Sequence, residues 1–209
     1  MTDYRLNPDW YRAKYYLASQ YANWASDPGD GEKPAHLANA ERCATELIAQ
    51  IDETLRQRRW GASSSDVEAL RTFIGDEVRP NAKVLLAEVA LARQASEATG
   101  TEEAEVEEVE PAVQEVEEEA PETSELSYSL ARFYAQANRD QQAQEYLEAA
   151  IEKAEPDGWQ ALAHRIVRDP VLFEVTPPST RSIEGFSSKL AAAREEAGVE
   201  VQAEAQDLD

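Results

Sequence analysis

The sequence predicts an all-α protein made of antiparallel helical hairpins that are interrupted by a disordered acidic linker. Along most of the chain, apolar and small residues recur at steps of three and four, which is the spacing of one helix face. No segment alternates apolar and polar residues as a half-buried strand would. Between the two helical parts lies a glutamate-rich stretch with two prolines and no aromatic residue.

The first hairpin begins at about Pro8, where Asn7 can cap the helix and a proline suits the first helical position. The stretch SDPGDGEKP ends this helix. Its apolar face is expected to contain Trp10, Ala13, Leu17, Tyr21 and Trp24.

A longer helix is expected from about residue 35 to residue 60. The single cysteine, Cys43, falls on its apolar stripe, so we expect a buried small hydrophobic residue there and no disulfide. The stripe consists of Leu37, Ala40, Ala44, Leu47, Ile51 and Leu55.

A third helix is indicated by the run from Ser65 to Glu68, which fits the capping-box pattern of a helix start. Pro80 removes one backbone hydrogen bond and clashes with the preceding turn, so a kink or a break is expected there. A further helix follows from about 81 to 98. Residues 1–97 therefore form an N-terminal helical part.

Residues 98–124 are interpreted as a disordered acidic linker. Their valines recur, but so little apolar surface is not expected to offset the entropy lost when the segment becomes ordered. Beyond it, residues 125–176 are expected to form a helical hairpin, from about 125 to 137 and from 140 to 154, and a closing helix from about 158 to 168. Residues 177–209 are expected to form an irregular segment, a short helix and an acidic tail.

The net charge of −22 is concentrated in two places. Residues 97–125 contain thirteen glutamates and no base, and residues 195–209 add six acids and no base, whereas the rest is close to neutral. Such acidic runs repel nucleic acid and anionic membranes, so neither is an expected partner. The N-terminus MTDYRLNPDW has neither the basic region nor the apolar run of a signal peptide, which favours a cytoplasmic location.

The hairpin YSLARFYAQANRDQQAQEYLEAA, residues 128–150, resembles the tetratricopeptide repeat (TPR), a helix–turn–helix unit. The matching positions are Leu130, Ala131 and Tyr134 in the first helix, and Ala143, Leu147 and Ala150 in the second. The segment that follows resembles the ending of some bacterial proteins of this type, at Asp169, Pro170 and Leu172. Ser127 departs from the pattern, since the family often has tryptophan there.

The N-terminal hairpin resembles a degenerate copy, although its loop is longer than the family allows. Leu17, Ala18 and Tyr21 occupy the first-helix positions, and Ala40, Ala44 and Leu47 are candidates for the second. Repeats of this kind bury their apolar faces on each other, and three or more usually stack. The resemblance thus implies that the two parts pack together across the linker, or that another protein completes them.

In the repeat family, outward positions of each first helix line a groove that binds a protein or peptide. The resemblance places Arg12, Tyr15, Ser19 and Asn23 there in the first hairpin, and Tyr128, Arg132 and Gln136 in the second. Tyrosine and arginine suit peptide capture, because tyrosine offers a rigid apolar ring and arginine can bind a carboxylate through two hydrogen bonds. Alternatively, Tyr15 and Tyr128 belong to the core.

No catalytic constellation is expected. His36 and His164 lie on separate helices without cysteine or paired carboxylates at ligand spacing, which disfavours a metal site. The phosphate-binding and nucleophile motifs are missing, and no cofactor is expected.

The sequence therefore predicts a non-catalytic adaptor or scaffold, cytoplasmic and bacterial, that binds a protein or peptide through a TPR-like surface. Two alternatives remain open at this stage. The acidic linker could act as an electrostatic decoy or chaperone for basic partners, or the chain could be a structural subunit of a larger complex. The oligomeric state is not indicated.

Overall fold

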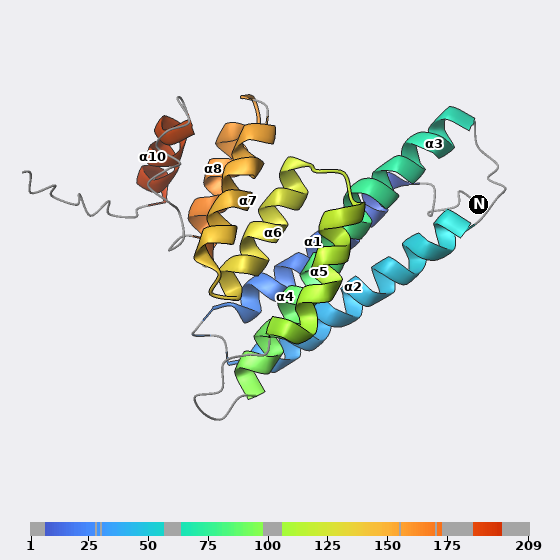
Figure 1. Ribbon diagram of the computed structural model, residues 1–209, viewed down its shortest axis with the longest axis horizontal. Helices are drawn as coiled ribbons and strands as arrows, with labels where there is room; N and C mark the ends of the chain where they lie inside the picture. Colours follow the sequence, from blue (N-terminus) through green and yellow to red (C-terminus); the bar gives the residue numbers. More distant parts are fainter. Residues whose placement is uncertain are drawn as a thin grey trace, which may run out of the picture.

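The computed structural model describes residues 7–27, 29, 31–56, 64–97, 106–154, 156–169, 171–172 and 186–197. Every regular element within these ranges is a helix, which confirms the all-α prediction (Figure 1). In the same part of the chain, no helix is long and apolar enough to cross a membrane.

The first two helices, α1 (Pro8–Ala25) and α2 (Lys33–Arg56), pack against each other as a hairpin. Asn7 caps α1 as predicted, since its Oδ1 accepts a hydrogen bond of 3.0 Å from the backbone N–H of Asp9. The expected stripe of α2 is buried from Leu37 to Ile51 and includes Cys43, as predicted.

The packed face of α1 differs from the expectation. The buried residues are Tyr11, Tyr15, Ala18, Ala22 and Ala25, whereas Leu17 and Trp24 are 46% and 47% exposed. Both stripes are apolar, but the three alanines let neighbouring helices approach closely. The hydroxyl of Tyr11 also has a buried partner, Thr54 Oγ1 at 2.9 Å. The packing role predicted for Leu17 is therefore wrong.

The helices on either side of Pro80 are joined without a break. They are α3 (Ser64–Thr72), a π-helical segment η2 (Phe73–Val78) and α4 (Arg79–Glu97). Arg79 N–H donates to the carbonyl of Ile74, five residues earlier. Proline would clash with the carbonyl four residues before it in a regular helix, and the wider π-helical turn relieves that clash.

Residues 106–119 form helix α5 (Val106–Glu119), so the prediction of a disordered linker over 98–124 is wrong for this segment. Val113 and Val116 are buried in a cluster with Val84 and Leu91 of α4. Valine spacing of three and four supplies one apolar face, which packing on α4 stabilises by about 1.5–3 kcal/mol for each fully buried valine. The rest of the predicted linker before Val106 lies outside the described residues.

The C-terminal part contains α6 (Ser124–Gln136), α7 (Asp140–Lys153), α8 (Trp159–Arg168) and α10 (Phe186–Glu196). Asn138 adopts a φ of 56° in the turn between α6 and α7, a left-handed conformation that asparagine tolerates. All six residues expected at the seam of this hairpin are buried. The predicted acidic tail after residue 197 lies outside the described residues.

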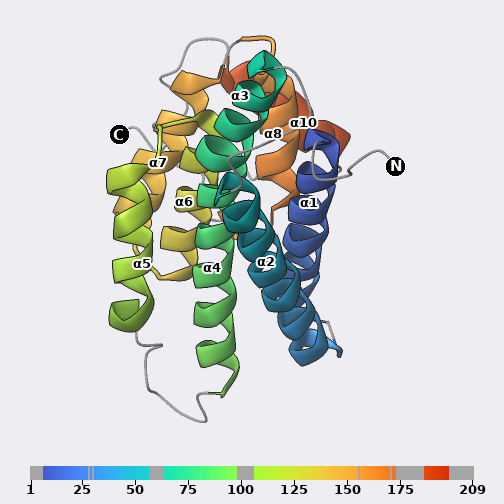
Figure 2. The same cartoon turned by 90° about the vertical axis from the view of Figure 1, so that its right-hand side faces the viewer.

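The buried apolar residues of the described helices form three clusters, one of which joins α4 and α5 with α6 and α7. Helix α4 packs against α2 on one side and against α5 and α6 on the other, and α8 packs against α10 (Figure 2). The expectation that the two parts pack together is therefore confirmed. This packing also brings α1 near α6, as shown by the 3.4 Å contact between the hydroxyls of Tyr15 and Ser129.

Candidate functional site

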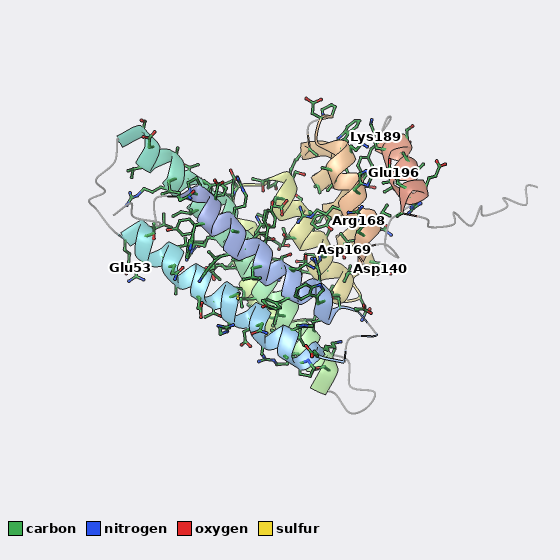
Figure 3. The ribbon with its side chains drawn as sticks, turned by 180° about the vertical axis from the view of Figure 1, so that it is seen from behind. Glu53, Asp140, Arg168, Asp169, Lys189 and Glu196 are labelled. Carbon is green, nitrogen blue, oxygen red and sulfur yellow. The ribbon has the colours of Figure 1, made fainter. Side chains whose placement is uncertain are left out.

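A pocket of about 330 Å³ lies between α1, α6 and α8. Helix α8 supplies four of its side chains at steps of three and four, so that they share one face. Figure 3 shows Arg168 and Asp169 at the end of α8. The lining residues are Ser19, Asn23, Tyr128, Arg132, Ala161, His164, Arg165, Arg168 and Asp169.

Arg132 is only 4% exposed and lies between two acids. Its Nε is 3.1 Å from Asp169 Oδ2, and its Nη2 is 3.7 Å from Oε2 of Glu88 on α4. Neither nitrogen donates a hydrogen bond, so both contacts are electrostatic. Burial alone would lower the pKa of Arg132, but Glu88 and Asp169 together raise it above its ordinary value.

Asp169 uses both of its carboxylate oxygens within the protein. Oδ2 accepts a hydrogen bond of 2.7 Å from the hydroxyl of Tyr128, and Oδ1 accepts one of 3.0 Å from the backbone N–H of Val171. Burial, and then the charge of Asp169, raise the pKa of Tyr128, so its hydroxyl remains a donor. Asp169 thereby ties the end of α8 to α6.

Arg165 is held in a similar way. Its guanidinium donates two hydrogen bonds to the carboxylate of Glu125, one of them 2.7 Å long, and lies 4.0 Å from the centre of the Tyr128 ring. A bidentate pair and a cation–π contact both restrict the side chain. This wall of the pocket is consequently preorganised.

Glu88 is 3% exposed, and its pKa is raised to about 7. The main cause is loss of hydration on burial, which outweighs the attraction of Arg132. The 3.7 Å separation without a hydrogen bond explains why Arg132 does not lower the pKa of Glu88 to its ordinary value.

Of the seven residues expected to bind a partner, four line the pocket: Ser19, Asn23, Tyr128 and Arg132. Tyr15 of α1 is buried, with its hydroxyl next to that of Ser129 on α6. Arg12 lies 4.9 Å from the Phe73 ring centre, and Gln136 is partly buried at the end of α6. These last three are not among the pocket residues.

The residues that were not expected at the site come mainly from α8. His164, Arg165 and Arg168 were not expected there, although the segment HRIVRD has basic residues at helical spacing and Asp169 stood in the resemblance to a closing motif. His164 Nε2 lies 3.4 Å from Oε2 of Glu196 on α10. Glu88 had no sequence signal, because it lies in an otherwise apolar stretch of α4.

Within the described ranges, no group of three or more His, Cys, Asp or Glu side chains is placed to hold a metal ion. Comparison with protein-family models finds no match, and neither curated proteins nor solved structures give one. The pocket's own chemistry is therefore the basis for a functional assignment.

Proposed function

We propose that the chain is a non-catalytic, cytoplasmic adaptor that binds a protein or peptide on the face formed by α1, α6 and α8. The strongest support for this proposal is that exposed apolar side chains lie on the same helix as residues of this pocket. Tyr16 is 56% exposed and lies on the same side of α1 as Ser19 and Asn23, at steps of three and four. Leu17 and Trp24 extend the exposed apolar surface. Aromatic residues beside preorganised polar groups are typical of protein-binding surfaces.

The proposal includes a TPR-like stacking of the helical hairpins. Buried Ala131 and Ala143 are compatible with the close approach of α6 and α7, and the rings of Tyr134 and Tyr146 stack with centres 5.5 Å apart. The exposed Leu17 fits the repeat pattern poorly in the first hairpin.

A non-catalytic role is supported by how the acids near the pocket are used. The carboxylate of Asp169 is occupied by Tyr128 and backbone donors. Glu88 has the raised pKa of a general base, but it is not among the residues that line the pocket and lies next to buried Arg132. Neither group is placed to exchange a proton with a substrate.

The alternative of an acidic decoy has less support. Glutamates of the proposed decoy segment pair with the protein's own bases: Glu110 with Arg139, Glu115 with Lys83 and Glu122 with Lys153. A segment that engages basic partners would have to give up these ion pairs.

Site-specific photo-crosslinking tests the adaptor proposal. Benzoylphenylalanine in place of Tyr16 should crosslink a partner in the native host, and the same group in place of Glu118 should not. Glu118 is exposed on α5, which lies at the opposite edge of the molecule from α1 (Figure 2). A partner seen at Tyr16 should be lost when Trp24→Ala is added. Equal crosslinking from both positions, or turnover of a substrate by the purified chain, would contradict the proposal.

A further inference from the structure

The pocket between α1, α6 and α8 is lined by basic side chains in a strongly acidic chain. Three arginines and a histidine lie on its wall, together with one acid, Asp169. The full sequence has a net charge of −22. A cavity with this lining attracts an anion.

The arginines differ in how far the protein already neutralises them. Arg165 is paired with Glu125, and Arg132 lies between Asp169 and Glu88. Arg168 is exposed and has no hydrogen-bond or ion-pair partner within the residues that the structure describes. It is therefore the cation best able to accept a ligand.

Two further observations point to an occupant. Arg132, whose side chain is 5% exposed, lines the pocket with two nitrogens that donate no hydrogen bond. On the opposite wall, Asn23 has a buried side-chain Oδ1 without a hydrogen-bond partner, and this oxygen can accept a hydrogen bond only from an N–H or O–H group of a ligand. Buried polar atoms in native proteins are usually satisfied, so these atoms mark a place where a polar ligand group is missing.

The charge and size of the pocket restrict that ligand group. Since only Arg168 lacks a neutralising partner in the described residues, the wall can balance about one negative charge, whereas a phosphate monoester has roughly −1.5 to −2. A volume of about 330 Å³ corresponds to about eleven water molecules at ~30 Å³ each. That space holds the end of one side chain or of one peptide, not a folded element.

We infer that this pocket binds a single carboxylate of a protein partner, held by Arg168 beside the guanidinium of Arg132, while Asn23 Oδ1 accepts a hydrogen bond from a neighbouring N–H of the partner. The inference rests on the proposed adaptor function, because exposed Tyr16 on the same side of α1 as Asn23 gives the partner's neighbouring residues an apolar contact. The carboxylate belongs either to an acidic side chain or to a chain terminus, and the two sources share this chemistry.

Three short acetylated alanine peptides, each with one tryptophan, distinguish the sources. One has an internal aspartate and an amidated end, one has asparagine and a free C-terminus, and one has asparagine and an amidated end. Titration into the isotopically labelled full chain is followed by NMR at the arginine Nε–H groups and at His164. The first or the second peptide should shift the signals of Arg168 and His164 saturably, and the third should not.

Arg168→Gln should weaken binding of the effective peptide roughly tenfold or more, as expected for loss of a charge-assisted hydrogen bond. Arg42→Gln is the matched control, since it removes one exposed positive charge from α2. Equal weakening by both variants would show only a general charge effect and would overturn the inference. It would also be overturned if inorganic phosphate bound as well as the carboxylate peptides, or if the neutral peptide bound equally.

Failure of this inference is distinguishable from failure of the adaptor proposal. If Tyr16 crosslinks a partner and Arg168→Gln leaves that crosslink unchanged, the adaptor stands and the carboxylate site is wrong. If the peptides bind as expected but no partner crosslinks at Tyr16, the site stands and the adaptor role fails.

Discussion

Glu88 is the residue whose environment gives the clearest pH dependence. Burial raises its pKa from 4.5 to about 7 in the folded protein, so the folded state holds a proton that the unfolded chain has released. The stabilising effect of that proton is fully present below pH 4.5 and is lost as the pH rises through about 7. The difference is on the order of 3 kcal/mol, since one pKa unit corresponds to about 1.4 kcal/mol.

Glu88→Gln should therefore flatten the pH profile of stability. Urea unfolding at a series of pH values between 4.5 and 8 should show that the wild-type free energy of unfolding falls relative to that of the variant. The remaining acids titrate in both proteins, so the difference between the two free energies of unfolding reports on Glu88 alone. A difference that does not change with pH would show that Glu88 is ionised throughout, through its pairing with Arg132.

Tyr128 should contribute more to stability through its hydroxyl than Tyr11 does. The Tyr128→Phe change removes the 2.7 Å donor of the buried Asp169 carboxylate and should cost about 1.5–3 kcal/mol. Tyr11→Phe is the matched control, because it removes a bond to the neutral Thr54 hydroxyl and should cost about 1 kcal/mol. Both costs are measured by urea unfolding at pH 7, and an equal loss would mean that Asp169 gains little from Tyr128.

At the scale of single residues, the sequence predicted part of the site. Ser19, Asn23, Tyr128 and Arg132 were expected from their register on two helices, and the fold brings them together. Arg168 was not expected, because whether an arginine faces a pocket or solvent depends on how α8 packs. That packing depends on contacts distant in sequence, such as the one between Asp169 and Tyr128.

Among the elements, α5 is a glutamate-rich helix whose stability is expected to depend on the burial of its valines. Val113 is buried against α4 and α6, whereas neighbouring Ala112 is exposed. Val113→Asp should expose the α5 amides to hydrogen exchange and lower the free energy of unfolding by at least about 2 kcal/mol, because it buries an unpaired charge. Ala112→Asp adds the same charge and should change little. Equal exchange in both variants would indicate that α5 does not depend on its valine face.

Whether the buried face of a helix could be predicted depends on how many apolar faces its sequence offers. The sequence of α2 offers a single apolar face, and the residues on that face are buried in the structure from Leu37 to Ile51. Helix α1 has two apolar stripes, and the choice between them depends on close packing at Ala18 and Ala22 and on a partner for the Tyr11 hydroxyl. For α5, the sequence shows the periodic valines, but it does not show that an apolar surface of α4 packs against them.

For the whole molecule, the acidic segment connects two parts that share one apolar cluster. Leu130 of α6 lies in the cluster with Val84 and Leu91 of α4, and the Glu88–Arg132 pair lies between the same two helices. Packing of this extent should make the N-terminal and C-terminal parts unfold together. A flexible linker between independent domains would give two separate transitions.

Tryptophan fluorescence can follow each part separately. One variant keeps only Trp24, on α1, and another keeps only Trp159, whose Nε1 donates to the carbonyl of Ala154. Urea transitions of the two should coincide. Leu130→Ala should then lower both midpoints equally and cost about 2–5 kcal/mol, because a cavity forms where α4 and α6 meet. If only the Trp159 transition moved, the two parts would fold independently, and the pocket between α1 and α8 would depend on a weak interface.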